Sequence, residues 1–212
     1  MKKAILFDFD GTLANTAPGI VATLAETLRR MQKPIPTDED ARQTIGLPLR
    51  DALQRLGRLT DDEADMAREI YTDLFMTIEV NNISLFPDVE QTLQHLVAKG
   101  LRLAIVTSRD KASLDVVLSR YGLTAYFEQT ITCDDHLTPK PAPDMVDELL
   151  RRMQLQPTDV LVMGDTTYDI DMGNAAHADT IAITYGNHTR QQLDASQPTH
   201  IVDHFHDILQ LI

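Results

Sequence analysis

Short and nearly continuous apolar runs recur along the chain at wide intervals. They are rich in Ile, Leu and Val, and they lack the alternation of apolar and polar positions that marks a strand with one solvent-exposed face. Such runs are typical of strands buried on both faces of a parallel sheet. They lie at residues 4–9, 101–106, 160–163 and 180–184, and a weaker candidate surrounds Ile131.

Amphipathic stretches separate the later runs. In residues 87–100 apolar positions recur at helical spacing, and Gly100 is a stop signal. Residues 111–122 and 143–154 repeat this design. Strands that alternate with helices predict a doubly wound, Rossmann-like α/β core with a parallel sheet.

The stretch from residue 15 to residue 84 differs, because it holds no convincing strand. Its pattern predicts helices, and two of them begin with a capping pair, Thr37 with Asp40 and Thr60 with Glu63. We therefore expect an α-helical cap at residues 15–84, inserted into an α/β core of residues 1–14 and 85–212. The predicted cap helices cover residues 16–30, 37–45, 48–56 and 60–80.

Composition narrows the classes of function. Of the 212 residues, 43% are hydrophobic, which is ample for a core, and the net charge is −13. Such acidity repels polyanions, so we expect no nucleic-acid partner. The apolar start at residues 4–7 is too short for a signal peptide, and no run approaches the roughly 20 residues of a membrane span. The single cysteine, Cys133, cannot form an internal disulfide, which fits a reducing cytosol, so we expect a cytoplasmic protein without a membrane partner. A monomer and a homodimer both stay open.

Polar side chains follow the predicted strands where each strand ends. In an open α/β sheet, ligands bind beyond the carboxyl ends of the strands, so residues at these positions should meet at one edge. Taken singly, each is also consistent with a helix cap or a solvated surface group. The set comprises Asp8 and Asp10, then Thr107 and Ser108, then Lys140, and finally Asp165 and Asp169.

Crowded carboxylates raise one another's pKa, and a hard cation relieves that repulsion. Oxygen ligands alone favour Mg²⁺, which also allows a carboxylate to approach an anionic phosphate. One carboxylate could then attack phosphorus, and a second could move a proton to the leaving oxygen and later from water. A lysine, a hydroxyl and backbone N–H groups could hold the phosphate oxygens.

Four motifs in one order resemble those of the haloacid dehalogenase-like hydrolase superfamily. They are DFDGTLANT at residues 8–16, VTS at 106–108, KP at 140–141 and GDTTYDIDMG at 164–173. The resemblance covers essentially the whole chain, and it is closest to the phosphoglycolate phosphatase-like branch with a helical cap.

The resemblance implies a role for each matching residue. Asp8 would be the nucleophile that forms an aspartyl-phosphate, and Asp10 would be the general acid and base. Thr107, Ser108 and Lys140 would bind the phosphoryl group. Mg²⁺ would be held by Asp8, Asp10 (through its backbone carbonyl) and Asp165, with Asp169 at or just behind the metal ligands.

The resemblance also bears on the reaction and on the cap. The carbon–halogen hydrolases of the superfamily lack an aspartate at the position of Asp10, because a halide leaves without a proton. An aspartate there implies hydrolysis of a phosphate ester. In the cap, the turn at residues 44–49 resembles the cap loop of phosphoglycolate phosphatases and related pyrophosphatases, so the specificity candidates are Gly46 and the flanking Arg42 and Arg50, which could also be ordinary solvated residues.

The leading hypothesis is an Mg²⁺-dependent phosphatase that acts on a small phosphorylated metabolite. Phosphoglycolate-like compounds, sugar phosphates and pyrophosphate all fit the sequence. Two alternatives stay open. One is a phosphomutase of the same superfamily, and the other is a receiver-type protein that is phosphorylated but not catalytic. The inserted cap and the GDTTYD stretch weigh against a receiver, which needs neither.

Overall fold

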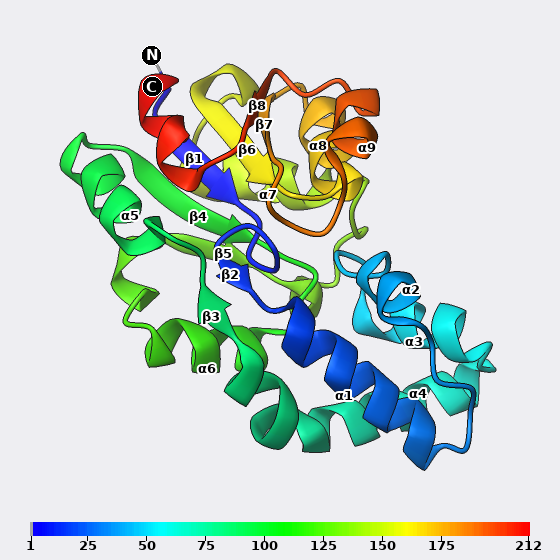
Figure 1. Ribbon diagram of the computed structural model, residues 1–212. Helices are drawn as coiled ribbons and strands as arrows, with labels where there is room; N and C mark the ends of the chain where they lie inside the picture. Colours follow the sequence, from blue (N-terminus) through cyan, green and yellow to red (C-terminus); the bar gives the residue numbers. More distant parts are fainter. Residues whose placement is uncertain (1) are drawn as a thin grey trace.

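A six-stranded parallel sheet forms the centre of the computed structural model, which describes residues 2–212 (Figure 1). The strand order is β5-β4-β1-β6-β7-β8, so the chain runs outward from β1 in both directions, as a doubly wound fold requires. This order places the carboxyl ends of β4, β1 and β6 next to one another. The strands are β1 (Ala4–Phe7), β4 (Arg102–Val106), β5 (Gln129–Ile131), β6 (Val160–Gly164), β7 (Asp179–Ile183) and β8 (His200–Val202).

Side chains of alternate strand positions enter two separate apolar cores, one on each face of the sheet. Ile5 and Phe7 of β1 belong to the first core, and Ala4 and Leu6 belong to the second. Because both faces are covered, the strands carry continuous apolar sequence, which confirms the predicted fold class. Helices α5 (Val89–Ala98) and α6 (Lys111–Arg120) pack in the first core, α7 (Asp144–Met153) and α8 (Thr167–Ala175) pack in the second, and α9 (Arg190–Ala195) contacts α8.

The predicted first strand at residues 4–9 is two residues too long. β1 ends at Phe7, and Asp8, which directly follows, donates its N–H to the carbonyl of Met163 at 2.8 Å. Phe9 is fully buried in the first apolar core. Both acids therefore lie in the loop after the strand.

Residues 15–84 contain the predicted helices, and Figure 1 shows α1–α4 gathered on one side of the molecule, away from the six-stranded sheet. They share an apolar cluster that includes Leu28, Leu53 and Tyr71. The Thr60–Glu63 capping box and the Thr37 cap on Asp40 N–H are both present. The helices are α1 (Ala17–Arg30), α2 (Asp38–Arg42), α3 (Leu49–Gly57) and α4 (Asp61–Leu74).

Two features mark the junctions of this helical region with the sheet. A small antiparallel ribbon joins β2 (Ala14–Asn15) to β3 (Ser84–Leu85), at the boundaries expected for the cap, although the division into two domains stays a prediction. The helix predicted for residues 60–80 changes character near its end. After α4 it continues as a π-helical turn, Phe75–Glu79, and a 3₁₀ turn, Val80–Asn82. π-helical turns are rare and often occur at functional sites.

Within residues 2–212, none of the helices combines the length and apolar character that a membrane crossing needs.

Candidate active site

Asp8 lies at the centre of a cluster of buried charges at the carboxyl edge of the sheet. Its side chain is almost fully buried, and its Oδ1 accepts a hydrogen bond from Lys140 Nζ at 2.6 Å. The same ammonium group donates to Oδ1 of Asp169, also at 2.6 Å. Lys140 has no exposed side-chain surface, so it is the counter-charge for two carboxylates at once.

Asp165 follows β6 and is held by polar groups from other loops. Thr12 donates to its Oδ1 at 3.1 Å, and the backbone and side-chain N–H groups of Asn187 donate to its Oδ2 at 2.7 and 2.9 Å. The loop after β1 approaches very closely. A Cβ atom at Gly11, where φ is +96°, would lie 2.2 Å from Asp165 Oδ2, so only glycine fits this position.

Three carboxylates of this cluster can act together as metal ligands. Asp8, Asp165 and Asp169 each offer an oxygen atom, and these oxygens lie within 4.8 Å of one another. Burial raises the pKa of Asp8 well above its usual range, and Asp169 and Asp165 raise it further against the opposing effect of Lys140. Burial and the charge of Asp169 raise the pKa of Asp165 to about 7. Buried oxygens that carry more negative charge than one lysine balances suit a hard divalent cation.

Asp10, whose backbone carbonyl is the fourth expected ligand, lies close to this cluster. Asn187 Nδ2 approaches the Asp10 carbonyl oxygen at 3.4 Å and also binds Asp165. The Asp10 side chain points elsewhere. Both of its oxygens accept hydrogen bonds from Arg109, at 2.6 Å from Nη2 and at 3.1 Å from Nε.

Thr107 and Ser108 follow β4, as predicted, but they differ in what they contact. Thr107 is buried, and its Oγ1 accepts the N–H of Arg109 at 3.1 Å. Ser108 donates its hydroxyl to the carbonyl of Gly46 in the cap at 2.7 Å. The Ser108 side chain therefore joins the core to the cap, and its backbone N–H is the group expected to bind phosphate.

Gly46 is the cap candidate that contacts the core most closely. Its φ is +103°, and a Cβ atom there would lie 3.1 Å from the ring of Tyr168 and 3.3 Å from Thr166 Oγ1. Both neighbours lie at the start of α8, directly after Asp165. The cap loop thus rests on the loop that carries the candidate metal ligand.

The two cap arginines predicted as specificity candidates lie elsewhere. Arg50 is bound to Asp65 at 2.9 Å and to Asp61 at 3.0 Å, both in α4 of the cap. Neither Arg50 nor Arg42 lines the pocket between cap and core. The structure therefore gives neither arginine a contact with the candidate site.

A pocket of about 840 Å³ separates the cap from the core above Asp10 and Ser108. Its apolar lining comes mainly from the cap, with Leu24, Ile45, Leu49 and Phe75 among the residues. The charged lining is mostly acidic. It consists of two arginines, Arg68 and Arg109, and six carboxylates, Asp10, Glu69, Asp73, Glu79, Asp110 and Asp134.

Several polar residues of the site were not among the predicted ones. Asn187 follows β7, and the strand-end rule that found the other residues, applied to the run at residues 180–184, would have found it. Arg109 directly follows the predicted Ser108. Glu79 and Arg68 carry no such signal, because their places depend on how the cap folds onto the core.

Comparison with known proteins agrees with this geometry. A family model described as "Haloacid dehalogenase-like hydrolase" matches residues 5–183. The "Probable phosphatase IndB" of Dickeya dadantii is 34% identical over 213 residues, which cover 99% of this chain and 93% of that protein. A "Phosphoglycolate phosphatase" of Vibrio vulnificus is 28% identical, with 99% and 96% coverage.

The fold agreement extends to solved structures. The crystal structure of a predicted phosphoglycolate phosphatase from Haemophilus somnus superposes with a TM-score of 0.91 at 27% identity, and the match covers 99% of this chain and 97% of that one. The four motifs, the doubly wound sheet and the match over most of the length lead to one conclusion. The chain belongs to the haloacid dehalogenase-like hydrolase family.

Proposed function

We propose that the protein is an Mg²⁺-dependent phosphatase that hydrolyses a small phosphorylated metabolite through an aspartyl-phosphate on Asp8. The observation that carries this proposal is the buried cluster of Asp8, Lys140, Asp165 and Asp169 at adjoining loops of one sheet edge. A Mg²⁺ ion held by the three carboxylates and the Asp10 carbonyl would offset the charge of a bound phosphate and polarise it. The names of the similar proteins support the same reaction class.

In the first half of the reaction, Asp8 is the nucleophile. Lys140 fixes Oδ1, and among residues 2–212 no group donates a hydrogen bond to Oδ2, so Oδ2 is the atom placed to attack phosphorus. As the new oxygen–phosphorus bond forms, the ester bond breaks, and Asp10 gives a proton to the leaving oxygen. Thr107 and the Ser108 N–H bind the phosphoryl oxygens.

In the second half, water attacks the phosphorus of the aspartyl-phosphate. Asp10 takes a proton from that water, and the bond between phosphorus and Asp8 breaks. The products are free phosphate and the original carboxylate. Lys140, which bonds to both Asp8 and Asp169, would balance part of the negative charge of the cluster in both halves.

The charges of the pocket favour one of the substrate classes that fit the sequence. A leaving group with its own carboxylate, as in phosphoglycolate, or a second phosphate, as in pyrophosphate, would face six carboxylates and two arginines, of which Arg109 is already bound to two acids. The hydroxyl groups of a neutral leaving group can donate hydrogen bonds to those carboxylates without repulsion. We therefore propose a sugar phosphate or a similar polyol phosphate as the substrate.

The test is phosphate release with Mg²⁺ from a panel that holds 2-phosphoglycolate, pyrophosphate, several sugar phosphates and 4-nitrophenyl phosphate. The proposal expects release that is lost in Asp8→Asn and in EDTA, and a kcat/KM for the best sugar phosphate about tenfold or more above that for 2-phosphoglycolate. Preference for 2-phosphoglycolate would overturn the substrate class but not the reaction.

The same assay separates the two alternative functions. A phosphomutase would give an isomerised sugar phosphate without free phosphate. A receiver-type protein would become phosphorylated once per chain and release nothing further. Equal phosphate release by the wild-type protein and Asp8→Asn would contradict the assigned nucleophile.

A further inference from the structure

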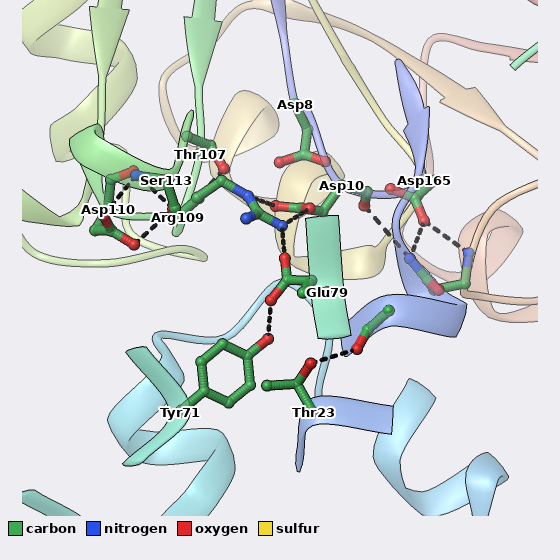
Figure 2. Close-up of polar contacts among 12 residues, drawn as sticks. Asp8, Asp10, Thr23, Tyr71, Glu79, Thr107, Arg109, Asp110, Ser113 and Asp165 are labelled. Atoms are coloured by element: carbon green, nitrogen blue, oxygen red, sulfur yellow. Dashed lines mark hydrogen bonds and ion pairs between the residues drawn. The ribbon is translucent and has the colours of Figure 1, made fainter. Parts of the chain in front are cut away.

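Arg109 lies between the core and the C-terminal end of the cap, and it bonds to one acid on each side. Its Nη2 donates to Asp10 Oδ1 at 2.6 Å and to Glu79 Oε1 at 2.6 Å, and its Nε donates to Asp10 Oδ2 (Figure 2). The exposed side-chain fraction is 6% for Arg109, 12% for Asp10 and 1% for Glu79. A buried arginine with two carboxylates is held far more firmly than an exposed pair.

Arg109 and Glu79 each make further contacts that hold them in place. The guanidinium carbon of Arg109 lies 6.0 Å from the ring centre of Phe9 and 5.8 Å from that of Phe75. The hydroxyl of Tyr71 donates to the second oxygen of Glu79 (Figure 2). The arginine is therefore fixed by two rings and two acids, and Glu79 is fixed by groups on both of its oxygens.

The backbone holds Glu79 in place as well. Glu79 ends the π-helical turn, and the carbonyl of the next residue, Val80, accepts a hydrogen bond from Arg120 of α6 at 2.7 Å. On the other side, Glu79 packs on α1 so closely that a Cβ atom at Gly19 would lie 2.6 Å from its carbonyl oxygen. The acid sits where the chain leaves the cap, between its first helix and the core.

We propose that Arg109 and Glu79 are positioning residues for proton transfer, with Glu79 orienting Arg109 and Arg109 orienting the Asp10 carboxylate. This inference rests on the proposed function, in which Asp10 exchanges a proton with the leaving oxygen. The two Asp10 oxygens are held unequally. Oδ1 is bound at 2.6 Å by the nitrogen that Glu79 also holds, whereas Oδ2 is bound at 3.1 Å, so Oδ2 is the oxygen that is released for the substrate.

The test compares two substrates that differ in their need for a proton. An alkoxide must be protonated as it leaves, whereas 4-nitrophenolate leaves readily without a proton. The ratio kcat/KM reports the steps up to release of the leaving group, so it isolates the acid role of Asp10. A residue that acts through Asp10 should therefore matter for the sugar phosphate and much less for 4-nitrophenyl phosphate.

Arg109→Lys keeps the charge but loses the two-pronged geometry. We expect kcat/KM to fall about 30-fold for the best sugar phosphate, which is less than the roughly 10²–10⁴-fold that a general acid contributes, because Asp10 itself is still present. For 4-nitrophenyl phosphate the loss should be less than about threefold. Glu79→Gln, which keeps the shape and one acceptor, should show the same selectivity with a loss of about fivefold on the sugar phosphate. The Glu79 variant also serves if Arg109→Lys fails to fold.

Arg50→Lys is the matched control, because Arg50 also binds two carboxylates but outside the pocket. It should leave both kcat/KM values unchanged. Equal losses on the two substrates in Arg109→Lys and Glu79→Gln, or no loss in either, would overturn the positioning role. That result is distinct from a failure of the proposed function, which Asp8→Asn alone would reveal by keeping its activity.

Discussion

The two ends of the candidate active site differ in how their carboxylates are balanced. We call the buried cluster of Asp8, Lys140, Asp165 and Asp169 the phosphoryl end, and the pocket between cap and core the leaving-group pocket. At the phosphoryl end, Asp8, Asp165 and Asp169 are buried, and Lys140 bonds to two of them. In the leaving-group pocket, several carboxylates line the wall without such a partner. Glu69 and Asp73, for example, are exposed on α4 and make no ion pair within the described chain.

Under the proposed function, this difference in charge would decide what each end binds. A buried set of three acids with one lysine lacks positive charge, and a divalent cation would supply it. The bound cation would also attract an anionic phosphate. An acidic pocket open to solvent needs no such completion, and it selects mainly by repelling anions. Under the proposed function, the reaction would take place at the core cluster, and the pocket between core and cap would select the leaving group.

The largest expected effect comes from removing Lys140, which balances the buried carboxylates. In Lys140→Met the carboxylates of Asp8 and Asp169 lose their shared partner in a buried site, so we expect the free energy of unfolding to fall by about 3–5 kcal/mol. Phosphatase activity should be lost with it. Urea denaturation in EDTA measures the change without a contribution from metal.

Lys111→Met is the matched control for that experiment. Lys111 also pairs with an aspartate, Asp115, but both side chains are about half exposed. Its loss should cost less than about 1 kcal/mol. If the two lysine variants lose similar stability, the buried cluster does not depend on its lysine as we argue.

The second prediction concerns pH and metal at the phosphoryl end. The pKa of Asp165 is raised from 3.8 to about 7, so between these values the folded protein holds more protons than the unfolded chain. Stability conferred by this shift is present below the unfolded pKa and is lost as pH rises through about 7. In EDTA, the free energy of unfolding should therefore fall from pH 4 toward pH 7.

Magnesium should reverse that trend, because it competes with protons for the same oxygens. We expect the rise in Tm on adding Mg²⁺ to be larger at pH 7.5 than at pH 5 in differential scanning calorimetry. Asp171→Asn, which changes an exposed carboxylate on α8, should keep this behaviour, and Asp165→Asn should lose it. A Tm shift that is equal at both pH values would contradict the metal site.

The sequence predicted that the residues of the buried cluster would lie together, because these residues obey one rule, whereas their roles stay a prediction. Asp8, Thr107 and Asp165 directly follow buried strands, and Lys140 lies in the segment between β5 and α7. Parallel strands bring their carboxyl ends together whatever the rest of the chain does. The expected doubly wound sheet is confirmed, and these residues lie at its edge. Local pattern was enough because the sheet order supplies the long-range contacts.

No such rule applies to the leaving-group end. The cap turn made Arg50 a specificity candidate, and in the structure Asp61 and Asp65 of the neighbouring helix bind it. Arg109 reads as an ordinary polar residue after Ser108, and its burial depends on Glu79, which lies 30 positions away. A helical pattern does not reveal which side of a cap helix faces the core. The partners of Arg50 and Arg109 could therefore not be predicted from the sequence.

The third prediction tests how closely the cap must approach the core. Gly46→Ala would place a Cβ atom against Tyr168 and shift the carbonyl that Ser108 binds, so kcat/KM should fall about tenfold for the best substrate. Gly100→Ala is the control. Gly100 also has a positive φ, +85°, but a Cβ atom there meets open space.

Both alanine variants should lose about 1 kcal/mol of stability from backbone strain. Only Gly46→Ala should lose activity, as steady-state kinetics would show. Equal activities would mean that the close contact between the cap loop and α8 is not needed for turnover.

The smallest expected effect probes the acidity of the pocket directly. Cys133 is an exposed residue on the pocket wall, but its thiol is partly desolvated, and this desolvation, together with the charges of Asp134 and Asp110, raises the pKa of the thiol to about 11. At pH 8 few thiolates exist, so iodoacetamide should alkylate Cys133 roughly 100-fold more slowly than a free thiol of ordinary pKa. Mass spectrometry of timed samples gives the rate.

Neutralising one acid near Cys133 then measures how strongly the negative charge of the pocket acts on the thiol. Asp134→Asn removes the charge nearest to the thiol, so we expect alkylation at pH 8 to accelerate about threefold, while Asp171→Asn on α8 changes nothing. The direction of the change in alkylation rate carries the information. An acidic wall that suppresses a thiolate also repels the carboxylate of an anionic leaving group, whereas an unchanged rate in Asp134→Asn would remove the electrostatic reason for preferring a neutral one.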